Sequence, residues 1–209
     1  GRERPLFSHG PNGNKRQLWL TEDFKLKAVV DEQQFTSTEA IKKNTFSKVA
    51  LVIDQKNSTL TFFRDGDALG TYKMENLYNG TGKLIFGRTN ESDRSESKYY
   101  EGRMMEARLW YRTMDGGLLS TTYGRRRLSG YEKDLVDYYP MNEGSGDYAM
   151  DKTQGANAKL IGANWAMPRG MSLHLNKEDK GLQLQSSALD RSSEQDYTLM
   201  FWFKTGAEI

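Results

Sequence analysis

The amino-acid sequence predicts an all-β protein, an antiparallel sandwich or barrel made of many short strands. Composition is the first indication, because the 209 residues combine 11% aromatic side chains with 20 glycines and only 4 prolines, as expected of strands joined by tight turns. The pattern is the second indication. Short apolar or alternating runs separated by turn residues recur along the chain, and helical periodicity is nearly absent.

The first clear hairpin lies in the first third of the chain. Residues 48–54 (KVALVID) form a continuous apolar run, which predicts a strand buried on both faces. Residues 59–64 (TLTFFR) form the returning strand. Asp65 and Gly66 follow it, and this dipeptide favours a two-residue hairpin turn because both positions adopt positive φ angles.

Further strands are predicted at residues 83–87 (KLIFG) and 102–111 (GRMMEARLWY). Strict alternation along the second of these strands places four side chains on one face: Met104, Glu106, Arg108 and Trp110. Residues 116–128 are the one weakly helical stretch, and the glycine pair at its start predicts that the helix is short.

The most aromatic strand is predicted at residues 197–204 (YTLMFWFK). One face carries Tyr197, Leu199, Phe201 and Phe203, and the other face carries Met200 and Trp202. A strand that is apolar on both faces belongs inside a sandwich, because an exposed edge of this kind invites aggregation.

Charge and cysteine content exclude several classes of function. The formal net charge is +2 and the 28% of charged residues mix both signs, which argues against nucleic-acid binding and against membrane insertion. The absence of cysteine excludes disulfides, zinc fingers and thiol catalysis. No run reaches the length of a transmembrane helix, and an exported form would carry its signal outside these residues.

Several motifs carry a resemblance to a known family. Residues 46–54 (FSKVALVID), 60–66 (LTFFRDG), 84–87 (LIFG) and 100–110 (YEGRMMEARLW) resemble, in this order, the second half of a laminin-G-like domain. These domains belong to the wider group of concanavalin A-like lectin/glucanase jelly rolls. The resemblance implies an antiparallel jelly-roll β-sandwich. Family members often carry Trp where this sequence has Phe46, a difference expected to change packing rather than function.

The remaining motifs resemble the start of another such domain. Residues 127–146 are similar to a junction between two domains, and residues 151–165 and 197–204 resemble the first half of the fold. Second-half motifs therefore precede first-half motifs, as in one period of a tandem array.

Two arrangements satisfy this order. In the favoured one, residues 1–130 are the C-terminal part of one sandwich and residues 131–209 are the N-terminal part of the next. In the alternative, both parts close into one circularly permuted domain. The alternative predicts that Phe201 and Phe203 contact the strands around Leu51, Ile53 and Phe62. The favoured arrangement predicts a separate lobe for residues 135–209.

The jelly-roll resemblance requires a test for glycoside hydrolysis, which needs two nearby carboxyl groups. Glu91, Asp93 and Glu96 match the spacing of the carboxylates on the catalytic strand of the glucanase branch. The apolar residues that would anchor such a strand are missing, because the segment is polar throughout. A charged surface loop is the preferred interpretation, and no catalytic residue is assigned. With only His9 and His174 available, other catalytic triads have little support.

Calcium is the one cofactor considered. Oxygen-bearing side chains crowd a glycine-rich segment that contains Asn142, Glu143, Asp147 and Asp151, and hard cations prefer such ligands. Domains that resemble this one often bind calcium near their first Asp-containing turn, which here would be at Asp151. The candidate ligands are therefore Asn142 and Asp151. The competing interpretation is local, since Asp and Asn also stabilise turns.

Candidate ligand-binding side chains are less specific. Exposed aromatic residues next to polar groups bind sugars, and the candidates are Trp165, Tyr99, Tyr100 and Tyr148. Trp110 and Trp202 are expected in the core. The run from Arg125 to Arg127 is expected to complement a helix end and solvate the surface. Three triplets match the glycosylation pattern, at Asn57, Asn79 and Asn90, but they do not identify a host.

These observations predict a non-catalytic, extracellular or cell-surface module that recognises a glycan or protein ligand. Its further partners would be neighbouring domains of the same long chain. Two alternatives stay open, a structural spacer in a tandem array and a glycoside hydrolase, because this architecture accommodates all three roles.

Overall fold

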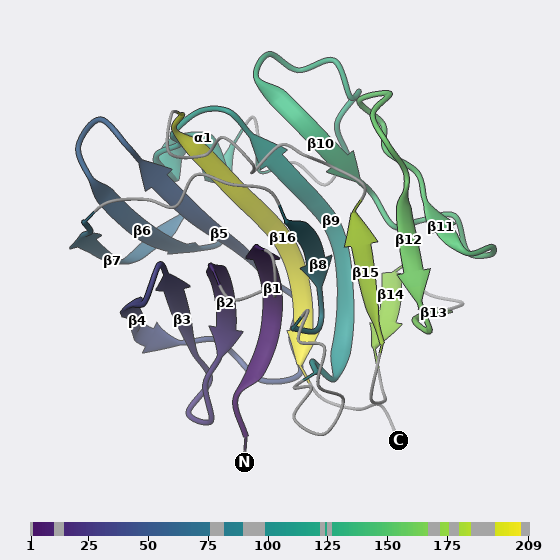
Figure 1. Ribbon diagram of the computed structural model, residues 1–209, viewed down its shortest axis with the longest axis horizontal. Coiled ribbons are helices and arrows are strands. Elements are labelled where there is room, and N and C mark those ends of the chain that lie inside the picture. The colour runs from purple at the N-terminus through teal and green to yellow at the C-terminus, as the bar shows by residue number, and fades with distance from the viewer. Residues whose placement is uncertain are drawn as a thin grey trace.

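The structure is a computed structural model, and it describes residues 2–10, 15–75, 82–89, 99–121, 124, 127–166, 172–175, 180–184 and 195–205. Within these residues two antiparallel sheets pack face to face and form a sandwich (Figure 1). The predicted all-β antiparallel sandwich is therefore confirmed. No helix in this part of the chain is long and apolar enough to cross a membrane.

Among the described residues, eight strands form the first sheet, sheet A. In spatial order they are β11 (Tyr148–Ala149), β12 (Ala158–Ile161), β15 (Gly181–Leu184), β8 (Lys83–Phe86), β1 (Arg4–Gly10), β2 (Arg16–Leu20), β3 (Lys25–Val30) and β4 (Gln33–Ala40).

Sheet B also has eight strands in the described part of the chain. The main path runs β13 (Asn164–Ala166), β14 (Ser172–Leu175), β9 (Gly102–Trp110), β16 (Tyr197–Thr205), β5 (Ser47–Asp54), β6 (Thr59–Arg64) and β7 (Asp67–Lys73), and β10 (Leu135–Tyr139) pairs with the second half of β9.

The core lies between the sheets and uses alternate residues of most strands. Leu51 and Phe62 of sheet B share one apolar cluster with Leu26 and Leu182 of sheet A. A second cluster covers the outer face of sheet B, where Trp110 packs with residues of α1 (Gly116–Ser120) and of the neighbouring strands. Strand β5 is buried on both faces for this reason, as its continuous apolar run predicts.

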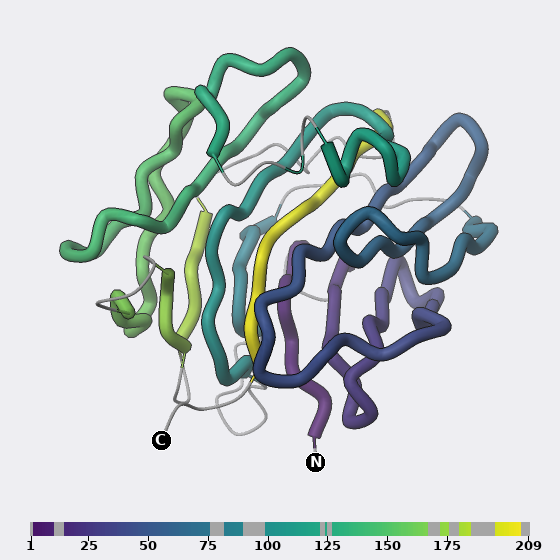
Figure 2. Tube along the Cα trace, turned by 180° about the vertical axis from the view of Figure 1, so that it is seen from behind, coloured from purple at the N-terminus to yellow at the C-terminus, as the bar shows by residue number. Residues whose placement is uncertain are grey.

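Strand β16 lies in the interior of sheet B. Figure 1 and the reverse view in Figure 2 show it, in yellow, between β5 and β9. Its two predicted faces are confirmed, because Phe201 and Phe203 join the core between the sheets and Met200 joins the outer cluster. The strand runs antiparallel to β5, so Phe203 pairs with Ser47 and Tyr197 takes the place beside Ile53.

Residues 131–205 thus contribute strands to both sheets of residues 1–130. Strands β14 and β10 extend sheet B at β9, and β15 extends sheet A at β8. No separate lobe forms from the described residues after 135, and this shared core is what the closed alternative describes. How domains divide within a longer polypeptide stays a prediction.

The face assignment predicted for β9 is wrong at one end. Met104 belongs to the core between the sheets together with Ala107 and Leu109, whereas Trp110 lies in the outer cluster. The reason is a β-bulge: the register with β16 shifts between Met200 and Trp202, and Glu106 has a φ of 58°. One extra residue reverses the alternation beyond it.

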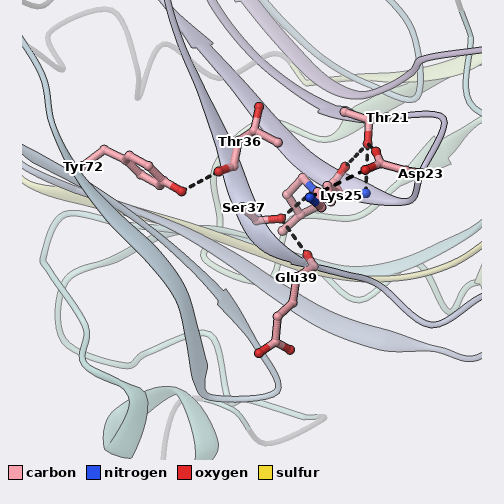
Figure 3. A network of polar contacts seen from close by, with 8 residues as sticks. Thr21, Asp23, Lys25, Thr36, Ser37, Glu39 and Tyr72 are labelled. Atoms are coloured by element: carbon pink, nitrogen blue, oxygen red, sulfur yellow. Dashed lines mark hydrogen bonds and ion pairs between the residues drawn. The ribbon is translucent and has the colours of Figure 1, made fainter.

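Side chains close the sandwich where the edge strands β4 and β7 meet. Tyr72 of β7 donates a hydrogen bond to the carbonyl of Thr36, and Thr38 donates to the carbonyl of Leu69 at 2.9 Å. Strand β4 has a β-bulge where it pairs with β3. At this bulge the hydroxyl of Ser37 accepts a hydrogen bond from the amide of Leu26 at 3.0 Å and donates one to the carbonyl of Glu39 (Figure 3). Occupied edge groups are poor templates for pairing with another chain.

The helix predicted within residues 116–128 covers only the start of that stretch, and it is short, as the glycine pair indicates. Helix α1 ends at Ser120, where the amide and hydroxyl of Thr121 both bond to the carbonyl of Gly117. Two glycines and the β-branched threonine that follows disfavour further turns.

Candidate ligand-binding pocket

An open pocket of about 500 Å³ lies on the outer face of sheet B. Its base is formed by β5, β6 and β7, and its wall is the segment from Arg112 to Leu118, which leads into α1. The lining residues are Val52, Asp54, Thr59, Thr61, Phe63, Ala68, Thr71, Arg112, Thr113, Met114, Asp115 and Leu118.

The base combines an apolar floor with hydroxyl groups. Phe63 is 8% exposed and packs in the outer cluster, while Thr59 and Thr61 stand at alternate positions of β6. Thr61 pairs with Thr71 across the strands, and their hydroxyl oxygens are 3.0 Å apart. Each hydroxyl offers one donor and two acceptor lone pairs, so this pair can also bond a ligand.

Two carboxylates at the pocket already have structural partners. Asp54 accepts hydrogen bonds at 2.8 Å from both the backbone and the side-chain amide of Asn57, within the β5–β6 turn. Asp115 caps α1 by accepting from the amide of Leu118 at 2.8 Å. Asp favours both positions because its side chain satisfies nearby backbone donors.

The pocket wall is attached to the sheet at both ends. The hydroxyl of Thr198 in β16 donates to the carbonyl of Arg112 at 2.7 Å. The ammonium of Lys48 in β5 donates to the carbonyl of Leu119 at 2.7 Å. Burial lowers the pKa of Lys48, an effect that Asp65 opposes. The wall is therefore a fixed feature of the sheet surface.

A buried charged cluster joins β9, β10 and β16 of sheet B. Glu106 and Arg108 form an ion pair at 2.7 Å, and the hydroxyl of Tyr138 donates to the same carboxylate oxygen at 2.9 Å. The guanidinium of Arg108 also lies 4.7 Å from the ring centre of Trp202. Burial and the neighbouring carboxylate raise the pKa of Tyr138 to about 12. Solvent does not reach Arg108, whose side chain is 0% exposed, and Glu106, Arg108 and Tyr138 do not line the pocket.

The two calcium candidates have different surroundings. Asp151 is buried and accepts hydrogen bonds from the amides of Tyr138 and Thr153 at 3.0 and 2.9 Å. Asn142 is half-buried, and the neighbouring Glu143 accepts from the amide of Met150. In the part of the chain that the structure describes, no three His, Asp or Glu side chains group as metal ligands would. The calcium site stays a prediction.

The aromatic candidates do not form one platform. Tyr100 is fully buried and donates its hydroxyl to the carbonyl of Lys204, whereas Trp165 donates its indole N–H to the carbonyl of Gly146 at 2.8 Å. Tyr99 stacks with Arg2 and Tyr148 is 49% exposed.

Trp110 is fully buried, as predicted, and Trp202 packs half-buried against the same cluster. Several other predictions fall outside the described residues, namely the segment with Glu91, Asp93 and Glu96, the acceptors Asn79 and Asn90, and the pair Arg125 and Arg126.

The pocket was not predicted from the sequence. The usable signal was the alternation of threonines at positions 59 and 61, on a strand whose central residues are otherwise apolar. That signal marks a polar outer face but does not indicate what covers it. The wall begins just over fifty residues later in the chain, at Arg112, so only the folded structure brings base and wall together.

Comparison with known proteins identifies the family. Residues 1–117, more than half of the chain, match a laminin G family model described as the concanavalin A-like lectin/glucanases superfamily. Neither a curated protein nor a solved structure matches the chain. The match covers β1 to β9 and agrees with the antiparallel jelly-roll sandwich, a fold that serves as a ligand-binding or structural module. The chain belongs to the concanavalin A-like lectin/glucanases superfamily.

Proposed function

We propose that the chain is a non-catalytic ligand-recognition module of an extracellular or cell-surface protein, and that its pocket binds a carbohydrate. The observation that carries the proposal is the pocket base, which is lined by Phe63 together with Thr59, Thr61 and Thr71. Sugars present apolar C–H faces beside hydroxyl groups, and they are held by aromatic rings together with neutral polar side chains.

The size and chemistry of the pocket support a small ligand. About 500 Å³ falls within the range of roughly 300–1,000 Å³ that is usual for small-molecule sites. The three threonines carry no charge, so they favour a neutral polyhydroxylated ligand over an anion. Each hydroxyl contributes modestly, but an unpaired polar group left behind on binding is strongly unfavourable, which gives such a site its selectivity.

The surroundings of the carboxylates support a binding role over hydrolysis. Asp54 and Asp115, which line the pocket, hold a turn and a helix cap. Glu106, the nearest buried acid on β9, is paired with Arg108. A glycosidase instead needs one carboxyl group free to donate a proton and a second free to attack or to activate water.

A binding titration with matched variants tests the proposal. A glycan array first selects a ligand, and calorimetry then compares Thr61→Val with the exposed, distant Thr45→Val. Thr61→Val keeps the side-chain volume and removes the hydroxyl, and we expect at least a tenfold loss of affinity, about 1.4 kcal/mol. Thr45→Val should bind like the unmodified chain.

Three outcomes would contradict the proposal. Equal affinities of the two variants would remove the pocket as the binding site, and release of cleaved sugar would establish hydrolysis. Failure to bind any glycan, with a protein ligand or none captured instead, would favour one of the other module roles.

A further inference from the structure

Strand β16 occupies a slot in a framework made by other parts of the chain. Among the described strands, it is the one strand after residue 131 that lies between two strands of residues 1–110. The others of that part extend the sheets outward, for example β14 beside β9 and β15 beside β8. Without β16, strands β5 and β9 would be separated by the width of one strand.

Strand β16 pairs with both strands that border the slot. Seven residue pairs join β16 to β5 and seven join it to β9. Phe201 and Phe203 are 0% exposed, and Met200 is 0% exposed on the opposite face. An empty slot would expose two ladders of backbone groups and the sites of these side chains. The slot must therefore be filled by a strand of this pattern.

Nothing in this pairing requires the strand to come from the same chain. The link from Leu184 of β15 to Tyr197 of β16 has 12 residues, and it can span roughly 40 Å when extended. The same link can thus lead to the slot of a neighbouring molecule. We propose that the slot between β5 and β9 accepts β16 of a second copy of this chain, so that two copies exchange this strand.

Mass action sets when exchange occurs. A link of this length gives the strand an effective concentration on the order of millimolar at its own slot. Closed single chains therefore dominate dilute solutions, and exchanged pairs form when unfolded chains refold together at concentrations near that value. Folded chains exchange slowly, because β16 leaves only when sheet B opens.

Exchange would also join the binding pockets of the two copies. Thr198 of β16 holds the carbonyl of Arg112 in the pocket wall at 2.7 Å. In an exchanged pair, the Thr198 that holds each wall comes from the other molecule, so each pocket contains a contribution from both copies.

Engineered cysteines test the exchange, since the chain has none of its own. Arg103 of β9 and Lys204 of β16 are register partners and are both half-buried. One tagged chain carries Arg103→Cys and a second, differently tagged chain carries Lys204→Cys. The two are unfolded, mixed, refolded at low or high concentration, oxidised and separated under non-reducing conditions.

We expect a disulfide-linked pair with both tags after refolding at high concentration, at least fivefold more abundant than after refolding at low concentration. The matched control replaces Arg103→Cys by Lys159→Cys on β12, at the far side of sheet A, and should give only background. The double variant Arg103→Cys/Lys204→Cys, refolded dilute, should close within one chain and thus verify the register. Cross-linking equal to the Lys159 control at every concentration, with that internal bond formed, would overturn the proposal.

Discussion

Glu106 adopts a left-handed backbone conformation in the middle of a strand, with a φ of 58°. Such a conformation is uncommon for a residue with a long side chain and persists only where its surroundings hold it. Here Glu106 donates its amide to the carbonyl of Pro140 and bonds Arg108 and Tyr138 through its carboxylate. Strand β14 pairs with β9 before the bulge and β10 pairs with it after the bulge, so the carboxylate residue lies at the junction of these two strands.

Removing this acid should strongly destabilise the fold. In Glu106→Ala the buried guanidinium of Arg108 loses its counter-charge, and we expect the free energy of unfolding to fall by about 3–5 kcal/mol. Glu39→Ala is the matched control, because Glu39 pairs with Arg64 at 2.9 Å but its side chain is 63% exposed. Its effect should stay below about 1 kcal/mol. Urea unfolding measures both, and similar losses would contradict a special role for the buried pair.

At this scale the sequence was informative only where alternation was regular. The two faces of β16 could be read directly, because Phe201 and Phe203 alternate with Met200 and Trp202 without interruption. The bulge in β9 could not be predicted, because glycine usually marks positions with a positive φ and this position holds glutamate.

Helix α1 rests on the hairpin turn between β6 and β7. The sequence predicted this turn from Asp65 and Gly66, and Gly66 has a φ of 105°. A Cβ at Gly66 would lie 2.7 Å from the Cβ of Ser120 and 3.0 Å from the carbonyl oxygen of Gly116. The glycine is thus required twice, by its backbone angle and by the closeness of α1.

A pair of glycine substitutions separates these two requirements. Gly146 also has a positive φ, of 84°, but a Cβ there would meet nothing within 4 Å. Gly146→Ala should reduce stability by about 1 kcal/mol through its backbone angle alone. Gly66→Ala should reduce it by about 1–3 kcal/mol more, because overpacking displaces α1. Thermal unfolding compares the two, and equal losses would show that α1 does not press on the turn.

The same substitution should affect ligand binding. Displacing α1 moves Leu118, which lines the pocket, so Gly66→Ala should weaken the binding of any ligand in the pocket while Gly146→Ala should not.

The elements could be predicted singly from local signals such as the Asp-Gly turn. Their assembly into a pocket could not, because the contacts between base and wall are long-range.

The sandwich as a whole has one core to which the early and late parts of the chain both contribute. Leu51 of β5 and Leu182 of β15 belong to the same apolar cluster. We therefore expect one cooperative unfolding transition. Leu51→Ala and Leu182→Ala should each reduce the free energy of unfolding by about 2–5 kcal/mol and shift that same transition.

Calorimetry together with hydrogen exchange checks this expectation. Two transitions, with each variant shifting only its own, would indicate two independently stable units.

The fold class was predictable because short apolar runs and turn residues recur along the whole sequence. The shared core of the two parts was not predictable, because the motif order fits both a permuted domain and two partial domains, and the sequence favoured the partial domains.

The position of β16 in the sequence also determines when sheet B can be completed during synthesis. Its partner β5 is complete at Asp54, and β16 begins at Tyr197, so about 140 residues separate them. At roughly 5–20 residues per second, a ribosome needs about 7–30 s to make that stretch. Strand β9 is complete only at Trp110, so the nascent chain presents both apolar strands, β5 and β9, with no partner between them while the next 86 residues are made, for about 4–17 s at that rate. This interval is long compared with hydrophobic collapse. Until β16 has been translated, the exposed edges of these two strands are open to pairing with other chains.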